Sequence, residues 1–276
     1  DQEGCDFLTE APFSSLPIEK VWHPDHGWQK NLILNIAVRH CHGDYLIFCD
    51  GDTIPRSDFI ESHLSHARPK TFLSASAIDV PRHVYKTFTD LHITENHIFK
   101  HSFLTRVWPE ANKHSLRLQP RSLEQALNLI TWRYCVLRGA NFSLWRNDIE
   151  SVNGFDESYG YGSEDRELGV RLRNSGVASR WLKFSLMQLH LSHARTGYRD
   201  PSVVRMQRWK LRKLFLTRKM KVTHGLATAC ERSLATPESQ YIHTSRKIMT
   251  RPPSILRFKT SQPNTSQPAP RKRHAA

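Results

Sequence analysis

Asp50 and Asp52 stand one residue apart, directly after the short apolar run Tyr45–Cys49. A run of this kind is typical of a buried strand, and Gly51 permits a turn that would direct both carboxylates to one side. Carboxylate oxygens suit Mg2+ or Mn2+, and either ion in turn binds diphosphate oxygens. Because such acid pairs are also common in solvated turns, this motif alone leaves both a metal site and an ordinary surface turn open.

Glu164 and Asp165 form a second acidic pair, at the predicted start of a helix and just after the glycine-flanked Tyr161. The helix dipole favours acids in a first turn, which is the simple structural interpretation. The chemical interpretation is a general base beside an aromatic wall, because a carboxylate can take a proton from a sugar hydroxyl as it attacks. The ring of Tyr161 would then stack on a sugar face.

His190 and His193 lie close together at the end of a predicted strand. A lone histidine is more often structural than a ligand, but an imidazole pair near carboxylates can complete a Mn2+ coordination shell. Further upstream, the segment from Gly27 to Asn35 enters a helix, and its backbone amides together with Lys30 could meet an anionic phosphate. A plain capped helix explains that segment equally well.

The segments around these residues alternate between strand and helix patterns, which predicts an α/β fold with a mixed sheet flanked by helices. Residues 82–130 show only intermittent helical spacing. Strands are expected at 45–49, 71–80, 135–145 and 178–193, and helices at 30–40, 59–67, 146–154, 163–176 and 200–221.

The composition is that of an ordinary globular protein. The chain has 276 residues, of which 38% are hydrophobic, and this excludes a wholly disordered or collagen-like chain. No run approaches the roughly 18–20 apolar residues that cross a bilayer. The five cysteines form no C-x-x-C motif, which argues against a zinc site built from cysteines and favours a reducing, cytosolic compartment.

The net charge of +14 is confined to the end of the chain. Residues 1–200 hold 23 basic and 24 acidic side chains, whereas residues 201–276 hold 17 basic and 2 acidic ones. The sequence therefore predicts a neutral domain over 1–200, a basic helical extension over 201–232 and a basic, disordered tail over 233–276. Residues 203–221 mix cations with aromatic and aliphatic side chains, which indicates a helix at an anionic membrane surface, although a helix docked on the domain has the same pattern.

Four stretches, taken together and in order, resemble glycosyltransferase family 2, and most closely a bacterial branch with a galactosyltransferase-type C-terminal region. They are residues 21–38, 43–63, 138–176 and 189–193, and the most specific feature is GFDE followed by a G-x-G-x-E-D-x-E-L helix. The resemblance implies a GT-A, Rossmann-like fold. It also implies a nucleotide-sugar donor over the strand ends, with a divalent metal on its diphosphate.

The resemblance assigns roles to residues on the donor side. Asp52 and His193 match metal ligands, and His190 occupies a neighbouring position that is sometimes a ligand. Asp50 matches the acid that faces the nucleotide ribose and the metal-bound waters. The segment that lines the nucleotide pocket contributes Lys30 and Asn35.

On the acceptor side, Asp165 matches the catalytic base and Glu164 a partner of the acceptor hydroxyl, with Tyr161 and Gly162 beside them. The implied reaction is a single, inverting displacement that moves a hexose, with a UDP-sugar as the favoured donor, to a hydroxyl of a bacterial envelope glycan such as the lipopolysaccharide core. Such acceptors are built on lipid at the cytoplasmic face of the membrane. A cytoplasmic, membrane-peripheral enzyme is therefore expected.

The chain departs from the family pattern in two places. The family's first strand, with its Asp-Asp-Gly-Ser turn, has no counterpart before DQEGCDF, and Gln29 stands where an arginine is frequent. An N-terminally incomplete domain is expected, and an inactive remnant that only binds nucleotide-sugar or carbohydrate is the alternative. A nucleic-acid-binding protein is a third class, but the basic residues lie outside the patterned domain, and no nucleic-acid partner is expected.

Overall fold

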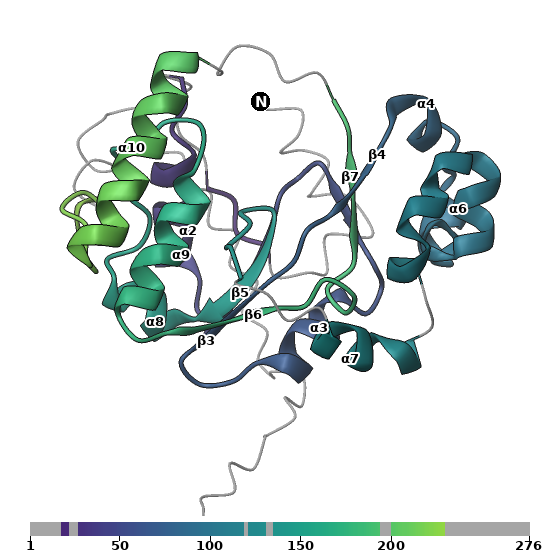
Figure 1. Cartoon of the computed structure of the whole chain (residues 1–276), viewed down its shortest axis with the longest axis horizontal. Coiled ribbons are helices and arrows are strands. Elements are labelled where there is room, and N and C mark those ends of the chain that lie inside the picture. Colours follow the sequence, from purple (N-terminus) through teal and green to yellow (C-terminus); the bar gives the residue numbers. More distant parts are fainter. Residues whose placement is uncertain (1–17, 22–26, 119–120, 131–134, 194–199, 230–276) are drawn as a thin grey trace, which may run out of the picture. The chain divides into compact units, whose positions relative to one another are not determined.

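The computed structural model describes residues 18–21, 27–118, 121–130, 135–193 and 200–229 (Figure 1). Apart from Ile18, they all belong to one compact unit, Glu19–His243. The predicted basic tail lies outside the described residues. The predicted boundary at residue 200 stays a prediction.

The larger sheet has four strands in the order β1-β5-β3-β6. Strand β5 (Asn141–Trp145) runs antiparallel to both of its neighbours, β1 (Tyr45–Cys49) and β3 (Thr71–Ser74). Strand β6 (Ala178–Trp181) pairs with β3 in parallel. The sheet is therefore mixed, as the sequence pattern predicts.

A second sheet has three strands in the order β2-β7-β4. Strand β2 (Thr53–Pro55) is antiparallel to β7 (Gln188–Leu191), and β4 (Ile78–Val80) is parallel to β7. The single strands expected at 71–80 and 178–193 are thus each divided between the two sheets. The sequence pattern does not reveal either break, because Ala75 after β3 and Leu182 and Leu186 after β6 are buried in one cluster, so apolar residues continue through both connections.

The intermittent pattern over 82–130 is confirmed as a series of short helices. They are α4 (Arg82–Tyr85), α5 (Asp90–Thr94), η2 (His97–Phe99), α6 (His101–Val107), η3 (Pro109–Leu118) and α7 (Arg121–Ile130). Figure 1 shows α4 and α6 beside β4 and β7. Leu189 of β7 and Ile78 of β4 share a buried cluster with Leu104 of α6, so this second sheet has its own core.

The remaining helices belong with the larger sheet and the candidate site. They are α2 (Lys30–His40), α3 (Phe59–His66), α8 (Arg146–Ser151), α9 (Glu164–Asn174) and α10 (Pro201–Thr217). Phe142 of β5, Phe155 and Leu168 of α9 lie in one buried cluster. Helix α10 lies against α9 (Figure 1). None of the helices in the described residues is long and apolar enough to cross a membrane.

The strand predicted over 135–145 begins only at Asn141, because a turn precedes it. The backbone N–H of Asn141 donates to the carbonyl of Arg138 at 3.0 Å and closes this turn. Just before it, Leu137 is buried against α9, where a Cβ added to Gly169 would lie 2.8 Å from its own Cβ. The glycine lets the turn approach the helix, and this close contact sets the 138–141 turn beside the first residues of α9.

Asn35 of α2 fastens the segment that leads into α9. Its Nδ2 donates to the carbonyl of Phe155 at 2.9 Å, and its Oδ1 accepts from the N–H of Phe155 at 2.8 Å. Gly154 precedes this contact with a φ of +71°, and a Cβ there would overlap the Asn35 amide oxygen. The position therefore requires glycine for both its backbone and its space.

Candidate active site

Asp52 lies between β1 and β2, and its side chain meets the end of β7. Because β2 and β7 are antiparallel, Thr53 stands opposite His190, and the N–H of Leu191 donates to the Asp52 carbonyl at 2.9 Å. Oδ2 of Asp52 lies 2.9 Å from Nε2 of His193 and 3.2 Å from Nε2 of His190. The pairing of two strands far apart in the sequence thus brings the three side chains together.

These three side chains form a donor set that fits a divalent cation. Their ligand atoms all lie within 4.8 Å of one another. Oδ1 of Asp52 is buried and has no hydrogen-bond partner among the described residues. Two imidazole nitrogens and a carboxylate suit Mn2+, and two nitrogens directed at one carboxylate oxygen require a cation or a proton between them.

Asp79 orients His190, although no motif in the sequence indicates this role. Oδ1 of Asp79 lies 2.8 Å from Nδ1 of His190. Since an ionised carboxylate only accepts, Nδ1 carries the proton in the neutral ring and Nε2 keeps its lone pair toward Asp52. In the sequence, Asp79 is only an acid between the two apolar residues of β4. Its position becomes informative once β4 pairs with β7, because the pairing sets Asp79 opposite His190.

The charge of Asp52 is stabilised by its histidine partners. Partial burial acts to raise the pKa of Asp52, but the hydrogen bond from His193 and the positive charge of His190 in its protonated form outweigh it and lower the pKa below its ordinary value. The side chain is therefore a carboxylate at neutral pH, which is the form that ligates a metal.

Asp50 connects this cluster to the first turn of α9. It pairs with Lys30, whose Nζ lies 2.8 Å from Oδ1 of Asp50. A Cβ added to Gly139 would lie 3.9 Å from that Nζ and 3.5 Å from the Cβ of Asp165. The N–H of Gly139 donates to Oδ2 of Asp165 at 3.1 Å. Lys30 and Asp165 therefore lie on the same side of Gly139, and only Asp165 is bonded to it.

Glu164 is the other carboxylate of this turn. It accepts a hydrogen bond from the N–H of Gly162 at 2.9 Å. Burial raises the pKa of Glu164, the neighbouring Asp165 adds to this effect, and Lys30 opposes it. Ser163, directly before the helix, has a left-handed φ of +75°, a conformation that costs about 1 kcal/mol or more for a residue other than glycine. Such local strain is typical of functional turns.

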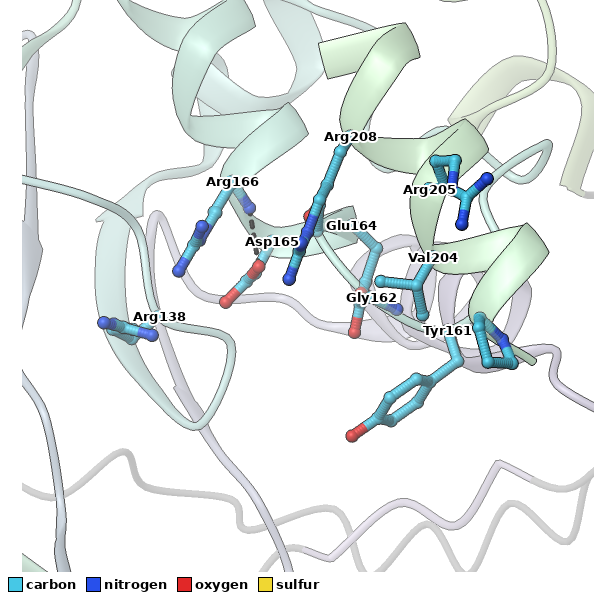
Figure 2. Close-up of a pocket in the computed structure, with 11 residues that line it drawn as sticks. Arg138, Tyr161, Gly162, Glu164, Asp165, Arg166, Val204, Arg205 and Arg208 are labelled. Atoms are coloured by element: carbon cyan, nitrogen blue, oxygen red, sulfur yellow. Dashed lines mark hydrogen bonds between the residues drawn. The ribbon is translucent and has the colours of Figure 1, made fainter. Parts of the chain in front are cut away.

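A cavity of about 850 Å3 lies between this turn and α10 (Figure 2). Tyr161, Glu164 and Asp165 line it from the α9 side, and Val204 and Arg208 line it from α10. The ring of Tyr161 packs edge-on against Trp28, with ring centroids 4.9 Å apart, so this contact supports the Tyr161 side of the cavity lining. This volume is within the range of small-molecule sites.

Most residues predicted for the site are brought together, but Asn35 is not. It is fully buried and its amide is committed to the backbone at Phe155, so a bound nucleotide would not reach it. Asp50 and Asp52 also diverge, toward Lys30 and the histidines, and Gly51 has no positive φ in the turn between them. The glycine at this turn therefore provides no special conformation.

Comparisons with known proteins agree on one class of enzyme. Residues 123–194 match the family model for the N-terminal domain of galactosyltransferase. A protein of Bacillus subtilis (strain 168), described as the uncharacterized glycosyltransferase YfnE, is 24% identical over 188 residues, which are 58% of this chain and 47% of that protein. The chain thus spans about half the length of this curated relative.

A solved structure is also similar. It is the mannosyltransferase PcManGT from Pyrobaculum calidifontis in complex with GDP-Man and Mn2+, at 13% identity and a TM-score of 0.36, covering 78% of this chain and 57% of that one. The family model and the Bacillus relative confirm the resemblance to glycosyltransferases that the sequence motifs indicate. The matched segment 123–194 contains both the first turn of α9 and the two histidines of the metal-binding cluster.

Proposed function

We propose that this glycosyltransferase-like chain is a metal-dependent enzyme that moves a hexose from a nucleotide-sugar donor to a hydroxyl group of a glycan. The observation that carries the proposal is a continuous series of functional groups from Asp52 to the cavity. Asp50 follows the same strand end, and Lys30 pairs with it. Lys30 lies on the same side of Gly139 as Asp165, and the N–H of Gly139 donates to Asp165. A donor at the strand ends and an acceptor in the cavity would meet beside Asp165.

Asp165 acts as the base that takes the proton of the acceptor hydroxyl. Its Oδ2 accepts from the N–H of Gly139 and its Oδ1 from the N–H of Arg166 at 2.7 Å, while the carboxylate still lines the cavity. These two backbone donors orient the carboxylate before the acceptor arrives, so proton transfer needs little rearrangement. A single base of this kind supports attack from the face opposite the leaving group, and hence inversion, without a carboxylate nucleophile.

The acceptor sugar lies against Glu164, Tyr161 and Gly162. Because its pKa is raised, Glu164 keeps a proton to higher pH than an ordinary glutamate and can exchange hydrogen bonds with sugar hydroxyls. The Tyr161 ring, supported by Trp28, offers a flat surface for a sugar face. Gly162 leaves space beside the two carboxylates.

The donor is held at the other end of the series. Asp52, His190 and His193 would hold a divalent cation, Mn2+ or Mg2+, whose charge would stabilise the diphosphate leaving group. Lys30 is placed to contact a phosphate oxygen and Asp50 a ribose hydroxyl. Asn35 contributes only by holding the segment at Phe155. The family resemblance favours a UDP-sugar as donor.

The same resemblance favours a bacterial envelope glycan, such as the lipopolysaccharide core, as the acceptor. Such glycans are assembled on lipid at the cytoplasmic face of the membrane, so the enzyme would act in the cytoplasm. The free thiols of Cys41, Cys49 and Cys135 are compatible with a reducing compartment.

Helix α10 supports contact with an anionic membrane surface. Gln207 and Leu214 are buried on the face toward the domain, whereas Trp209 is 61% and Leu216 85% exposed. The ammonium of Lys213 lies 5.5 Å from the centroid of the Trp209 ring. Exposed aromatic and aliphatic groups beside cations suit a bilayer surface, where each cation contributes about 1 kcal/mol. The face with Gln207 and Leu214 therefore fits docking on the domain, and the face with Trp209 and Leu216 fits a membrane surface.

The test of the enzymatic proposal is release of nucleoside diphosphate from UDP-glucose and UDP-galactose by the full chain, with and without Mn2+. Asp52→Ala should abolish release, and His193→Ala should weaken Mn2+ binding more than His190→Ala. Glu110→Ala, which removes an exposed acid outside the site, is the control and should behave like the wild type. Full activity of Asp52→Ala, or full activity in excess EDTA, would remove the metal assignment. Binding of UDP without any release would favour the binding remnant.

The membrane proposal is tested by co-sedimentation with anionic and neutral liposomes at low and high salt. Trp209→Ser with Leu216→Ser should reduce recovery on anionic vesicles, and high salt should reduce it further because it screens the cations. Equal recovery with both lipid types, or none with either, would contradict a membrane role.

A further inference from the structure

The cavity beside Asp165 is rich in arginine. Arg138, Arg166, Arg205 and Arg208 all line it, and they come from three separate parts of the chain: the turn before β5, the first turn of α9, and α10. Figure 2 shows Arg208 extending from α10 toward the two carboxylates, with Arg166 and Arg138 on the other side of Asp165. Three parts of the chain thus contribute guanidinium groups to the lining of the same cavity.

The guanidinium groups of these four arginines are not used by the fold. All four residues are exposed, and none of the guanidinium groups makes a hydrogen bond or ion pair with any part of the chain that the structure describes. Arg171 differs in every respect: it is fully buried, and its donors are bonded to Glu167 and to two backbone carbonyls. Side chains that the fold leaves unpaired around a cavity remain available to a ligand.

The cavity also carries an excess of positive charge. The only acids that line it among the described residues are Glu164 and Asp165, and both already accept backbone hydrogen bonds. Four like charges around a small volume repel one another, so an anion that enters relieves this repulsion. The N-terminal end of α9, where backbone N–H groups are oriented outward, adds to the positive potential.

We infer that this cavity binds an anionic acceptor, whose phosphate or carboxylate group lies between Arg138, Arg166 and Arg208. The inference rests on the proposed function, because it assigns a chemical class to the acceptor of the same reaction. A guanidinium group binds two oxygens of a phosphate or carboxylate at once, so three of them fix both the position and the orientation of the oxyanion. The anchored acceptor presents a neighbouring hydroxyl to Asp165.

The anionic group belongs to the acceptor and not to the diphosphate of the donor. The cavity lining includes the base, Asp165, but none of Asp50, Asp52, His190 or His193. The metal-binding cluster already provides for the diphosphate at the strand ends. A second anion-binding region on the far side of the base therefore serves the second substrate.

The test compares three sugars as probes for binding to the full chain by titration calorimetry: glucose 6-phosphate, glucuronate and glucose. Glucose 6-phosphate or glucuronate should bind more tightly than glucose, and the stronger of the two identifies the oxyanion as phosphate or carboxylate. Arg166→Ala with Arg208→Ala should weaken this binding about 10- to 100-fold, which is the effect of losing charged hydrogen bonds. Arg212→Ala, on the same helix but outside the cavity lining, is the matched control and should bind like the wild type.

Two results would overturn the inference. One is equal affinity for the three sugars; the other is an equal loss of affinity in Arg212→Ala, which would indicate unspecific charge attraction. Binding of UDP with Mn2+, measured in parallel, should be unchanged in the double variant, and a loss there would assign the arginines to the donor. If the wild type failed to bind UDP at all, the proposed function would fail while the arginine-dependent binding of the sugar anion could still be observed.

Discussion

Two consecutive turns of α9 use the same residue types in opposite ways. Glu167 and Arg171 are buried and bonded to each other at 2.6 Å, and Arg171 also donates to the carbonyls of Val152 and Gly154. One turn earlier, Arg166 is exposed and its guanidinium has no partner in the described part of the chain. The acids of that turn, Glu164 and Asp165, line a cavity.

The difference separates charges that hold the fold from charges that remain open to a ligand. Burying an ion pair costs desolvation energy, and the pair at Glu167 and Arg171 offsets this cost because each of its nitrogens and carboxylate oxygens has a partner. It holds the 152–154 loop, which leads to the first turn of α9. The guanidinium group of Arg166 is exposed, so it keeps its hydration and can exchange water for a substrate. The bonded second turn of α9 thus holds the first turn, whose Glu164 and Asp165 line the cavity, in position.

The largest effect is expected at the open turn. Asp165→Asn keeps the shape of the side chain but removes its ability to accept a proton, so turnover should fall about 10²- to 10⁴-fold. The affinity for UDP with Mn2+ should remain unchanged, as measured by calorimetry. The melting temperature should fall slightly, because asparagine offers one acceptor oxygen to the two backbone N–H groups that bond Asp165. Glu150→Gln, an exposed acid away from the cavity, is the control. Loss of donor binding in Asp165→Asn would instead make Asp165 a donor-binding or structural residue.

The buried turn should respond through stability. Arg171→Met leaves the Glu167 carboxylate and two carbonyls unpaired in the core, and should reduce the free energy of unfolding by about 3–5 kcal/mol in urea titrations. The double variant Glu167→Leu with Arg171→Met removes the buried charge as well. It should recover part of the loss, and a double variant less stable than Arg171→Met would contradict the desolvation argument.

Glu164 should make the stability contribution of the first turn depend on pH. Its folded pKa is raised by burial, so the folded state binds more protons than the unfolded state between the unfolded pKa and the folded one. The charge of Glu164 therefore lowers stability as pH rises through this interval. Glu164→Gln should raise the melting temperature slightly at pH 8 and leave it unchanged at pH 3.5, below the unfolded pKa of about 4.3. An equal gain at both pH values would exclude ionisation as the cause.

The smallest effect sharpens the comparison between two arginines of one helix. Arg166→Ala should change the free energy of unfolding by no more than about 0.5 kcal/mol, because it removes an exposed side chain without a partner in the described residues. The same substitution at Arg171 should destabilise the fold severely. A large loss of stability in Arg166→Ala would show that the first turn is also held by its charges.

Local patterns in the sequence predicted much of the fold and part of the site. The helices at 30–40 and after Ser163 and the strand at 45–49 were all recognisable, because periodicity and end signals act over a few residues. The acids at the strand end and the helix start stood out for the same reason. The split of 71–80 and 178–193 into strands of different sheets was not recognisable, since buried residues run through both breaks.

The sequence alone thus determined the approximate place of most strands and helices, the positions of the acids and histidines, and the gathering of positive charge after residue 200. The tertiary structure decided which of them meet. Pairing of β2 with β7 joins Asp52 to His190, pairing of β4 with β7 adds Asp79, and α10 brings Arg208 to the turn that carries Asp165. These contacts link residues far apart in the chain, and they form only because the packing of whole sheets and helices, not the neighbouring residues, sets the register and position of each element.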